Sequence, residues 1–383
     1  MRVMAPPAPG APGLARAYPD AVPVLVDPAA GVTLRPLEAL DLAAVVEQCR
    51  DPESIRWTTV PVPEGGYGAA DAEAFLGVVA DGWRSGELLT WAIEENSRPG
   101  RYCGSIDLRI AGDGTAETGF VLHPAARGRH LMRAALCLVR DFAFDVARLE
   151  ALRWRAVVGN WASRRVAAAA GWRFDGTIRS SLAHRGELLD GWVATLLASD
   201  PRAAQPWLEP PVLSADGFRL RPFTEADVPR ITEACADPRT QHWLASLPRN
   251  YRSAYALAYV TGTREMAAQA SGMVWCVADH ADDRCLASIS LEGLSGYSRR
   301  AEIGYWAHPE ARGRGLVTAA ARVVTGYAES QDLVDSLLIR AAATNTASRQ
   351  VAVAAGYREV GVLHRAELLG DGTLADLVLY ARP

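Results

Sequence analysis

The sequence of 383 residues contains no lysine, so its 40 basic residues are all arginine. The formal net charge is only −4, which gives no electrostatic reason to expect binding to nucleic acid or to an anionic membrane. No stretch approaches the roughly 18 uninterrupted apolar residues that a membrane-spanning helix needs. These absences favour a protein that binds neither nucleic acid nor membrane.

Cysteine is also scarce, with six in the whole chain, and no two of them form a CxxC pair. No His–Cys spacing resembles that of a zinc site, so we expect no bound metal. The thiols are predicted to be reduced, as in a cytoplasmic protein. The start of the sequence has no apolar segment typical of a secretory signal, which favours the same location.

The most informative pattern is one that occurs twice. HPAARGRHLMRAAL begins at His123, and HPEARGRGLVTAAA begins at His308, which is 185 positions later. Further pairs at this spacing are Glu117 and Glu302, Asn160 and Asn345, Ser163 and Ser348, and Gly171 and Gly356. A solenoid repeat would recur every few tens of residues, so this period predicts two copies of a whole domain.

The domain boundaries follow from composition. Residues 1–29 are rich in proline and alanine without periodicity, and we interpret them as a loosely packed arm. The first domain is predicted over 30–199 and the second over 214–383. Residues 200–213 are predicted to be a linker, because repeated prolines there prevent a continuous helix.

Each copy reads as a mixed α+β domain. Alternating apolar residues predict strands, and apolar residues at helical spacing predict helices, in the order β-α-β-β-β-α-β-α-β-β. The central strands are predicted at Leu88–Glu95, Tyr102–Ile110, Ala116–Pro124 and Leu152–Val158, and again at Gly272–Asp279, Cys285–Gly293, Ala301–Pro309 and Ser336–Ala342.

The segment ARGRG (Ala311–Gly315) lies where a strand ends and a helix begins. The first turn of a helix leaves backbone N–H groups unpaired and carries partial positive charge. Glycine lets these amides approach an anion, and Arg312 and Arg314 add charge suited to phosphate. The segment predicts a pyrophosphate cradle, although a glycine turn of this kind also simply ends a strand in many proteins.

This segment resembles the acyl-CoA loop of the GNAT superfamily of N-acetyltransferases, whose pattern is Q/R-x-x-G-x-G/A. Gly313 and Gly315 fit the pattern, whereas Glu310 departs from it. The flanking AEIGYWAHP, NTASRQVAVAAGY and RLRPFTEAD are similar to the branch that contains the ribosomal-protein N-terminal acetyltransferases. The resemblance implies two tandem GNAT domains, each with a mixed central β-sheet flanked by helices and with splayed strands that hold acyl-CoA.

The resemblance also implies roles for residues of the second copy. The backbone beside the splay would bind the pantetheine arm of acetyl-CoA, the loop amides would bind its pyrophosphate, and Asn345 is either a ligand or a helix cap. The cofactor-binding residues so implied are Tyr305, Trp306, Ala307, Arg312, Gly313, Arg314, Gly315, Leu316, Asn345 and Arg349.

The reaction needs a base for the amine and an acid for the departing thiol. Ala352 stands where many members of the superfamily have a catalytic tyrosine. By resemblance to the N-terminal acetyltransferase branch, Ser348 would protonate the sulfur and Glu367 would take the amine proton through water. Glu302 is the second candidate base, with a structural hydrogen-bonding role as its alternative. The alternative for Glu367 is a solvated carboxylate in a loop.

The first copy departs from this pattern. His130 replaces Gly315, and Leu182 stands opposite Glu367, with Glu187 nearby as a substitute. We expect little or no transferase activity there. We expect the first domain to act as a built-in partner in an intramolecular pseudo-dimer, within a monomer or a homodimer.

The sequence therefore predicts acetyl transfer from acetyl-CoA to a primary amine, foremost the N-terminal α-amine of a peptide or protein. One alternative acceptor is a small-molecule amine, such as an antibiotic, aminoglycoside or amino acid. A second alternative is a non-catalytic acyl-CoA sensor, against which Ser348 and Glu367 beside an intact loop argue.

Overall fold

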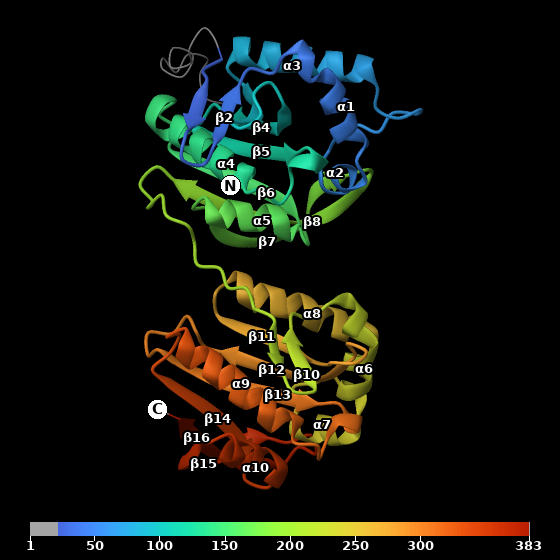
Figure 1. Cartoon of the computed structure of the whole chain (residues 1–383), viewed down its shortest axis with the longest axis vertical. Coiled ribbons are helices and arrows are strands. Elements are labelled where there is room, and N and C mark those ends of the chain that lie inside the picture. The colour runs from blue at the N-terminus through green and yellow to red at the C-terminus, as the bar shows by residue number, and fades with distance from the viewer. Residues whose placement is uncertain (1–21, 383) are drawn as a thin grey trace, which may run out of the picture. The chain divides into compact units, whose positions relative to one another are not determined.

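The computed structural model describes residues 22–382, which form two compact units with a boundary between Gln205 and Pro206 (Figure 1). The elements of the first unit are β1 (Leu25–Asp27), β2 (Val32–Arg35), α1 (Leu42–Arg50), α2 (Pro52–Trp57), α3 (Ala69–Ser85), β3 (Leu88–Glu95), β4 (Tyr102–Ile110), β5 (Thr115–Leu122), α4 (Leu131–Asp141), β6 (Ala151–Val157), α5 (Trp161–Ala169), β7 (Arg173–His184) and β8 (Glu187–Leu197).

The second unit repeats this series. Its elements are β9 (Leu213–Ala215), β10 (Phe218–Arg221), α6 (Val228–Ala236), α7 (Pro238–Trp243), α8 (Ser253–Ala268), β11 (Gly272–Asp279), β12 (Cys285–Glu292), β13 (Arg300–Ala307), α9 (Leu316–Ser330), β14 (Ser336–Ala342), α10 (Thr346–Ala354), β15 (Arg358–Leu368) and β16 (Leu374–Arg382). Within residues 22–382, no helix is long and apolar enough to cross a membrane.

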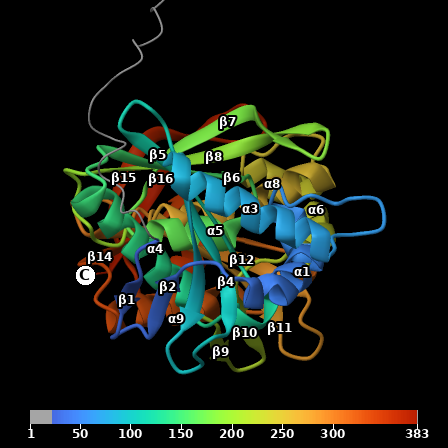
Figure 2. The ribbon, with the colours of Figure 1, turned by 90° about the horizontal axis from the view of Figure 1, so that it is seen from above.

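Each unit is built on an eight-stranded mixed sheet. The strand order is β1-β2-β3-β4-β5-β6-β8-β7 in the first unit and β9-β10-β11-β12-β13-β14-β16-β15 in the second. The hairpins β1–β2 and β7–β8 form the two edges of the first sheet (Figure 2). In each sheet one neighbouring pair is parallel, β5 with β6 and β13 with β14, and the others are antiparallel. The predicted α+β class with a mixed central sheet is confirmed.

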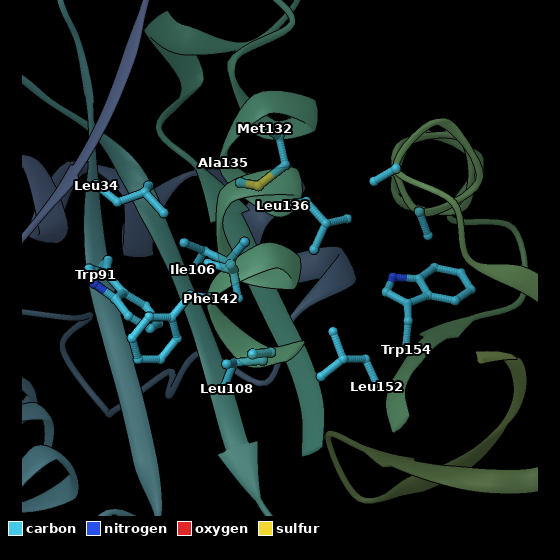
Figure 3. Packing of buried hydrophobic residues seen from close by; sticks show 14 of the residues in the cluster. Leu34, Trp91, Ile106, Leu108, Met132, Ala135, Leu136, Phe142, Leu152 and Trp154 are labelled. Atoms are coloured by element: carbon cyan, nitrogen blue, oxygen red, sulfur yellow. The ribbon is translucent and has the colours of Figure 1, made fainter. Parts of the chain in front are cut away.

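The helices cover both faces of each sheet, as the side chains of β11 illustrate. Trp275 and its alternate neighbours pack with α9 and α10, whereas Cys276 and its alternate neighbours pack with α6 and α8. Successive strand side chains point to opposite faces, so burial on both faces requires the uninterrupted apolar run that β11 has. In the first unit, Trp91 of β3 packs against Phe142 at the end of α4, and their ring centroids are 5.3 Å apart (Figure 3).

The sequence prediction omitted three elements in each copy. Helices α2 and α3, and their counterparts α7 and α8, lie between the first predicted helix and the central strands. The short strands β1 and β9 also precede the first predicted strands. Residues 22–29 of the predicted arm thus include β1, and the end of the predicted linker joins β9; the rest of the arm, residues 1–21, lies outside the described residues. Trp91 and Trp275 bind these segments by donating to the carbonyls of Pro23 and Pro211, at 2.9 Å each.

The parallel pair in the second sheet separates part-way along its length. β13 pairs with β14 only from Arg300 to Glu302, whereas its pairing with β12 continues to Ala307. From Ile303 onward, the side of β13 that faces β14 therefore has no partner strand. This is the splay that the resemblance implied, and it leaves backbone donors and acceptors available to a ligand.

Candidate active site

A cavity of about 680 Å³ occupies the second unit beside the splayed strands. The predicted site residues on its wall are Glu302, Tyr305, Trp306, Ala307, Arg312, Gly313, Gly315, Leu316, Asn345, Ser348 and Glu367. They come from β13, the loop after it, α9, α10 and β15. The fold thus brings residues that are more than sixty positions apart onto one continuous surface. Arg314 and Arg349 do not line this cavity.

The glycine loop has the backbone that an anion cradle needs. Gly313 and Gly315 adopt φ values of +72° and +71°, and a Cβ built on either would meet no atom within 4 Å. Gly315 is the cap residue of α9, so the unpaired amides of the first turn of that helix begin at this point. An oxyanion can therefore approach the loop backbone directly, and the predicted pyrophosphate site fits this geometry.

The two loop arginines have different surroundings. Arg312 donates to a carboxylate oxygen of Asp237, at 2.5 Å, and to the hydroxyl of Thr240, at 2.7 Å. Burial alone would raise the pKa of Asp237, but hydrogen bonds, the first from Arg312, lower it overall. The Arg312 guanidinium thus ties the loop to the start of α7. Arg314 is exposed at the loop surface.

Ser348 lies in the first turn of α10 and is held from two directions. Its backbone N–H donates to Oδ1 of Asn345 at 3.1 Å, so Asn345 caps the helix. The Tyr305 hydroxyl lies 2.9 Å from Oγ of Ser348 and donates to the Ser348 carbonyl at 3.1 Å. Burial raises the pKa of Tyr305 to about 12, so the phenol keeps its proton at neutral pH. Sequence reasoning gave Tyr305 a backbone role and missed this hydroxyl contact.

The two candidate bases differ in their partners. Oε2 of Glu302 lies 2.7 Å from Nε of Arg340, and this ion pair is the main reason why the pKa of the Arg340 guanidinium is raised. The Glu302 carboxylate is thus engaged with a guanidinium. Glu367 is half-buried on the cavity wall, and within residues 22–382 its carboxylate makes no hydrogen bond or ion pair. Glu367 is thus the freer proton acceptor.

Residues in and just after α7 also line the wall. Arg239, Trp243 and Leu244, from α7 and the residue after it, line the cavity. Arg349 instead donates to the Tyr380 hydroxyl at 2.9 Å and lies 3.5 Å from Glu359, which places it in contact with β15 and β16. Because α7 was omitted from the predicted elements, Arg239 and Leu244 were not found.

One group of potential metal ligands lies elsewhere in the second unit. Within the described residues, Asp227, Cys276 and Cys285 place one ligand atom each within 4.8 Å of one another. Arg221 donates to both carboxylate oxygens of Asp227, at 2.8 Å each. The guanidinium would repel a cation at this position, so the group fits a buried structural ion pair rather than a metal site.

The first unit keeps the backbone of the site but changes its side chains. His130 adopts φ of +59° at the position of Gly315, so the loop path is preserved. Phe120 occupies the register position of Tyr305. Oγ of Ser163 accepts the indole N–H of Trp154 at 3.1 Å. In the hairpin β7–β8, Leu182 occupies the register position that corresponds to Glu367 of the hairpin β15–β16, as the sequence spacing predicted.

The chain belongs to the acetyltransferase (GNAT) domain family, which it matches over residues 32–173 and again over 218–358. The resemblance stated from the sequence is thereby confirmed at the level of the family, and the tandem arrangement is confirmed with it.

Two curated relatives carry related names. YdaF of Bacillus subtilis (strain 168), which is named as a "putative ribosomal N-acetyltransferase", is 40% identical over 93 residues, which are 24% of this chain and 50% of that protein. A ribosomal-protein-serine acetyltransferase of Escherichia coli (strain K12) is 33% identical over 102 residues, 26% of this chain and 56% of that protein. The chain therefore spans about half the length of the curated relatives it matches.

Solved structures show weaker likeness. RimL, a ribosomal L7/L12 α-N-protein acetyltransferase in complex with coenzyme A, is 18% identical with a TM-score of 0.42, over 45% of this chain and 97% of that one. Mycobacterium smegmatis RimJ, in complex with a CoA disulfide, is 22% identical with a TM-score of 0.41, over 48% and 89% of the two chains.

Proposed function

We propose that the second unit transfers an acetyl group from acetyl-CoA to the N-terminal α-amine of a peptide or protein. One observation carries this proposal: a single cavity joins the open glycine loop, the unpaired edge of β13, the Ser348 hydroxyl and the Glu367 carboxylate. Membership of the acetyltransferase family and the names of the curated relatives support the same activity.

The residues present fit acetyl-CoA in two places. The amides of the Arg312–Gly315 loop and of Leu316 would hold the pyrophosphate, and the unpaired β13 backbone from Tyr305 to Ala307 would bind the pantetheine arm. Bound acetyl-CoA supplies an activated acetyl thioester. Arg312 contributes by fixing the loop to Asp237, and Asn345 by fixing the first turn of α10.

Two side chains would move protons in this reaction. Glu367, free of an ion pair within the described part of the chain, would accept the ammonium proton, directly or through a water. Ser348, which lines the same cavity, would donate to the departing sulfur. Glu302 is better suited to holding Arg340 in place than to accepting a proton.

The first unit is proposed to be inactive or nearly so. Its His130 side chain projects from the loop position where Gly315 has none, which crowds the approach of a pyrophosphate. The unit also lacks a carboxylate at the position of Glu367. These two differences remove the pyrophosphate cradle and the base. Ser163 accepts a hydrogen bond from Trp154 and keeps its own proton, so this contact does not by itself remove the acid.

The test is an assay of free thiol release from acetyl-CoA with three sets of acceptors: peptides that differ in their first residue, aminoglycosides and free amino acids. We expect release with peptides, and mass spectrometry should place the acetyl group on the α-amine. Preference for an aminoglycoside or an amino acid would establish the small-molecule alternative. Tight CoA binding without release for any amine would leave only the sensor function.

A further inference from the structure

The Ser348 side chain has a partner whose hydroxyl belongs to a different element of the site. Tyr305 lies on β13, and Ser348 lies on α10, 43 positions later in the chain. Their oxygens are 2.9 Å apart, and both residues line the cavity. The two hydroxyls therefore form a contact between two elements of the cavity wall, β13 and α10, rather than a contact within one turn.

Proton accounting limits what this pair can do. A phenol has one proton, and Tyr305 faces two acceptors on the same residue, the Ser348 carbonyl at 3.1 Å and Oγ at 2.9 Å. When the phenol O–H donates to the Ser348 carbonyl, the serine O–H donates to the phenol oxygen. When the phenol donates to Oγ, the serine proton is free to point into the cavity. Either arrangement holds Ser348 against Tyr305.

The first unit provides an internal contrast. Ser163, the counterpart of Ser348, accepts from the indole of Trp154, and Trp154 is buried. The second unit has Ile339 at the position of Trp154, and the first unit has Phe120 at the position of Tyr305. The serine thus has a hydroxyl partner only in the unit that also keeps both loop glycines and Glu367.

We propose that Tyr305 is a positioning residue for acetyl transfer, whose hydroxyl anchors Ser348 Oγ so that the serine proton is available to the leaving sulfur. This inference rests on the proposed function. In the balanced reaction, a C–N bond forms, the C–S bond breaks and its electron pair goes to sulfur. The ammonium nitrogen loses two protons in total: one reaches solvent through Glu367, and the other replaces the proton that Ser348 gives to the sulfur. Tyr305 returns to its starting state without net change.

Burial supports this role. Burial raises the pKa of Tyr305 to about 12, so its phenol keeps its proton throughout the range in which an alkyl thiol such as that of cysteine titrates, around a pKa of about 8.5. It can therefore act as a hydrogen-bond donor to Ser348 at every pH at which the thiolate must be stabilised.

The experiment compares Tyr305→Phe, Ser348→Ala and the double variant with the matched control Tyr357→Phe. Tyr357 is a buried tyrosine of the same unit that does not line the cavity, and its hydroxyl contacts Thr325 at 2.7 Å. Phenylalanine is accommodated at the equivalent position 120 of the first unit. For Tyr305→Phe, we expect kcat to fall roughly tenfold, because that factor corresponds to the net free energy of about one hydrogen bond. The KM for acetyl-CoA should not change. The double variant should lose no more than Ser348→Ala alone, because Tyr305 acts through Ser348.

A second measurement does not depend on turnover. The pKa of the thiol of bound CoA, followed by thiolate ultraviolet absorbance, should rise in Tyr305→Phe and in Ser348→Ala and stay unchanged in Tyr357→Phe. Equal kcat values for Tyr305→Phe and Tyr357→Phe, or losses that multiply in the double variant, would overturn the inference. Failure of the wild-type protein to acetylate any amine would instead overturn the proposed function.

Discussion

The indole N–H of Trp154 donates to Oγ of Ser163 at 3.1 Å. Because Trp154 is buried, replacing Ser163 with alanine leaves this N–H without a partner, which costs about 1–3 kcal/mol. Ser163→Ala should therefore lower the free energy of unfolding and leave acetyl transfer intact. Ser348→Ala should do the reverse, with a large loss of kcat and a small loss of stability. Denaturant unfolding and steady-state kinetics on both variants measure the two effects, and a loss of activity in Ser163→Ala would contradict the assignment of the active unit.

Glu367→Gln should lower kcat by roughly two orders of magnitude, because general-base catalysis contributes about 10²–10⁴-fold. The substitution keeps the size of the side chain, so the KM for acetyl-CoA should change little. Glu302→Gln serves as the control and should have a smaller effect on kcat, since its partner is Arg340. Full activity in Glu367→Gln would remove Glu367 from the mechanism.

Gly315→His should weaken CoA binding at least tenfold while the fold is retained. His130 shows that histidine can occupy the left-handed conformation of this loop, so the added side chain, rather than a changed backbone, would block the pyrophosphate. Calorimetric titration with CoA measures the effect. The reciprocal variant, His130→Gly, should leave affinity in the second unit unchanged, and equal affinity in Gly315→His would place the pyrophosphate elsewhere.

Asp107 should make the stability of the first unit depend on pH. Burial raises its pKa to about 6, and the nearby Glu117 carboxylate adds to the shift, whereas Arg109 opposes it. In the unfolded chain the aspartate pKa is about 3.9, so the folded state binds the proton more tightly. Stability is therefore greatest below about pH 4 for this group and falls as the pH rises to about 6.

Asp107→Asn removes this dependence. The free energy of unfolding should rise by on the order of 2 kcal/mol at pH 8 and should not change at pH 4. Because one fifth of the Asp107 side chain is exposed, solvent screening reduces the gain at pH 8. Thermal unfolding at the two pH values provides the measurement. An equal shift at both values would show that charge burial is not the cause.

The sequence predicted the central strands well because their patterns are strong. Predicted bounds for β3, β4, β11 and β14 agree with the structure to the residue. Helix α8 was missed because apolar residues also lie on its exposed side: Leu257 is exposed, while the buried side includes small residues such as Ala256. No clear helical period results from such a mixture. Helix α3 does have a helical period, with Ala72 and Val79 buried and Phe75, Leu76 and Trp83 partly buried, and the sequence analysis overlooked it.

The candidate site was predictable where one short segment holds the information. The glycines of the loop and the cap at Asn345 are local features, and both lie where the sequence placed them. Side-chain partnerships across the fold were not predictable. Arg312 was expected to face phosphate, but Asp237, which it contacts, lies 75 positions earlier. Such a contact depends on how α7 packs beside the loop.

The parallel ladder between β13 and β14 ends at Glu302, and the corresponding ladder in the first unit continues one pair further, to Thr118. The position at which the ladder ends thus sets how much of the β13 backbone remains unpaired. If the ladder were lengthened by two residues, the β13 backbone groups proposed to bind acetyl-CoA would instead form hydrogen bonds with β14. Loss of the cosubstrate would then accompany a gain in rigidity, without any change to an acid, a base or a glycine.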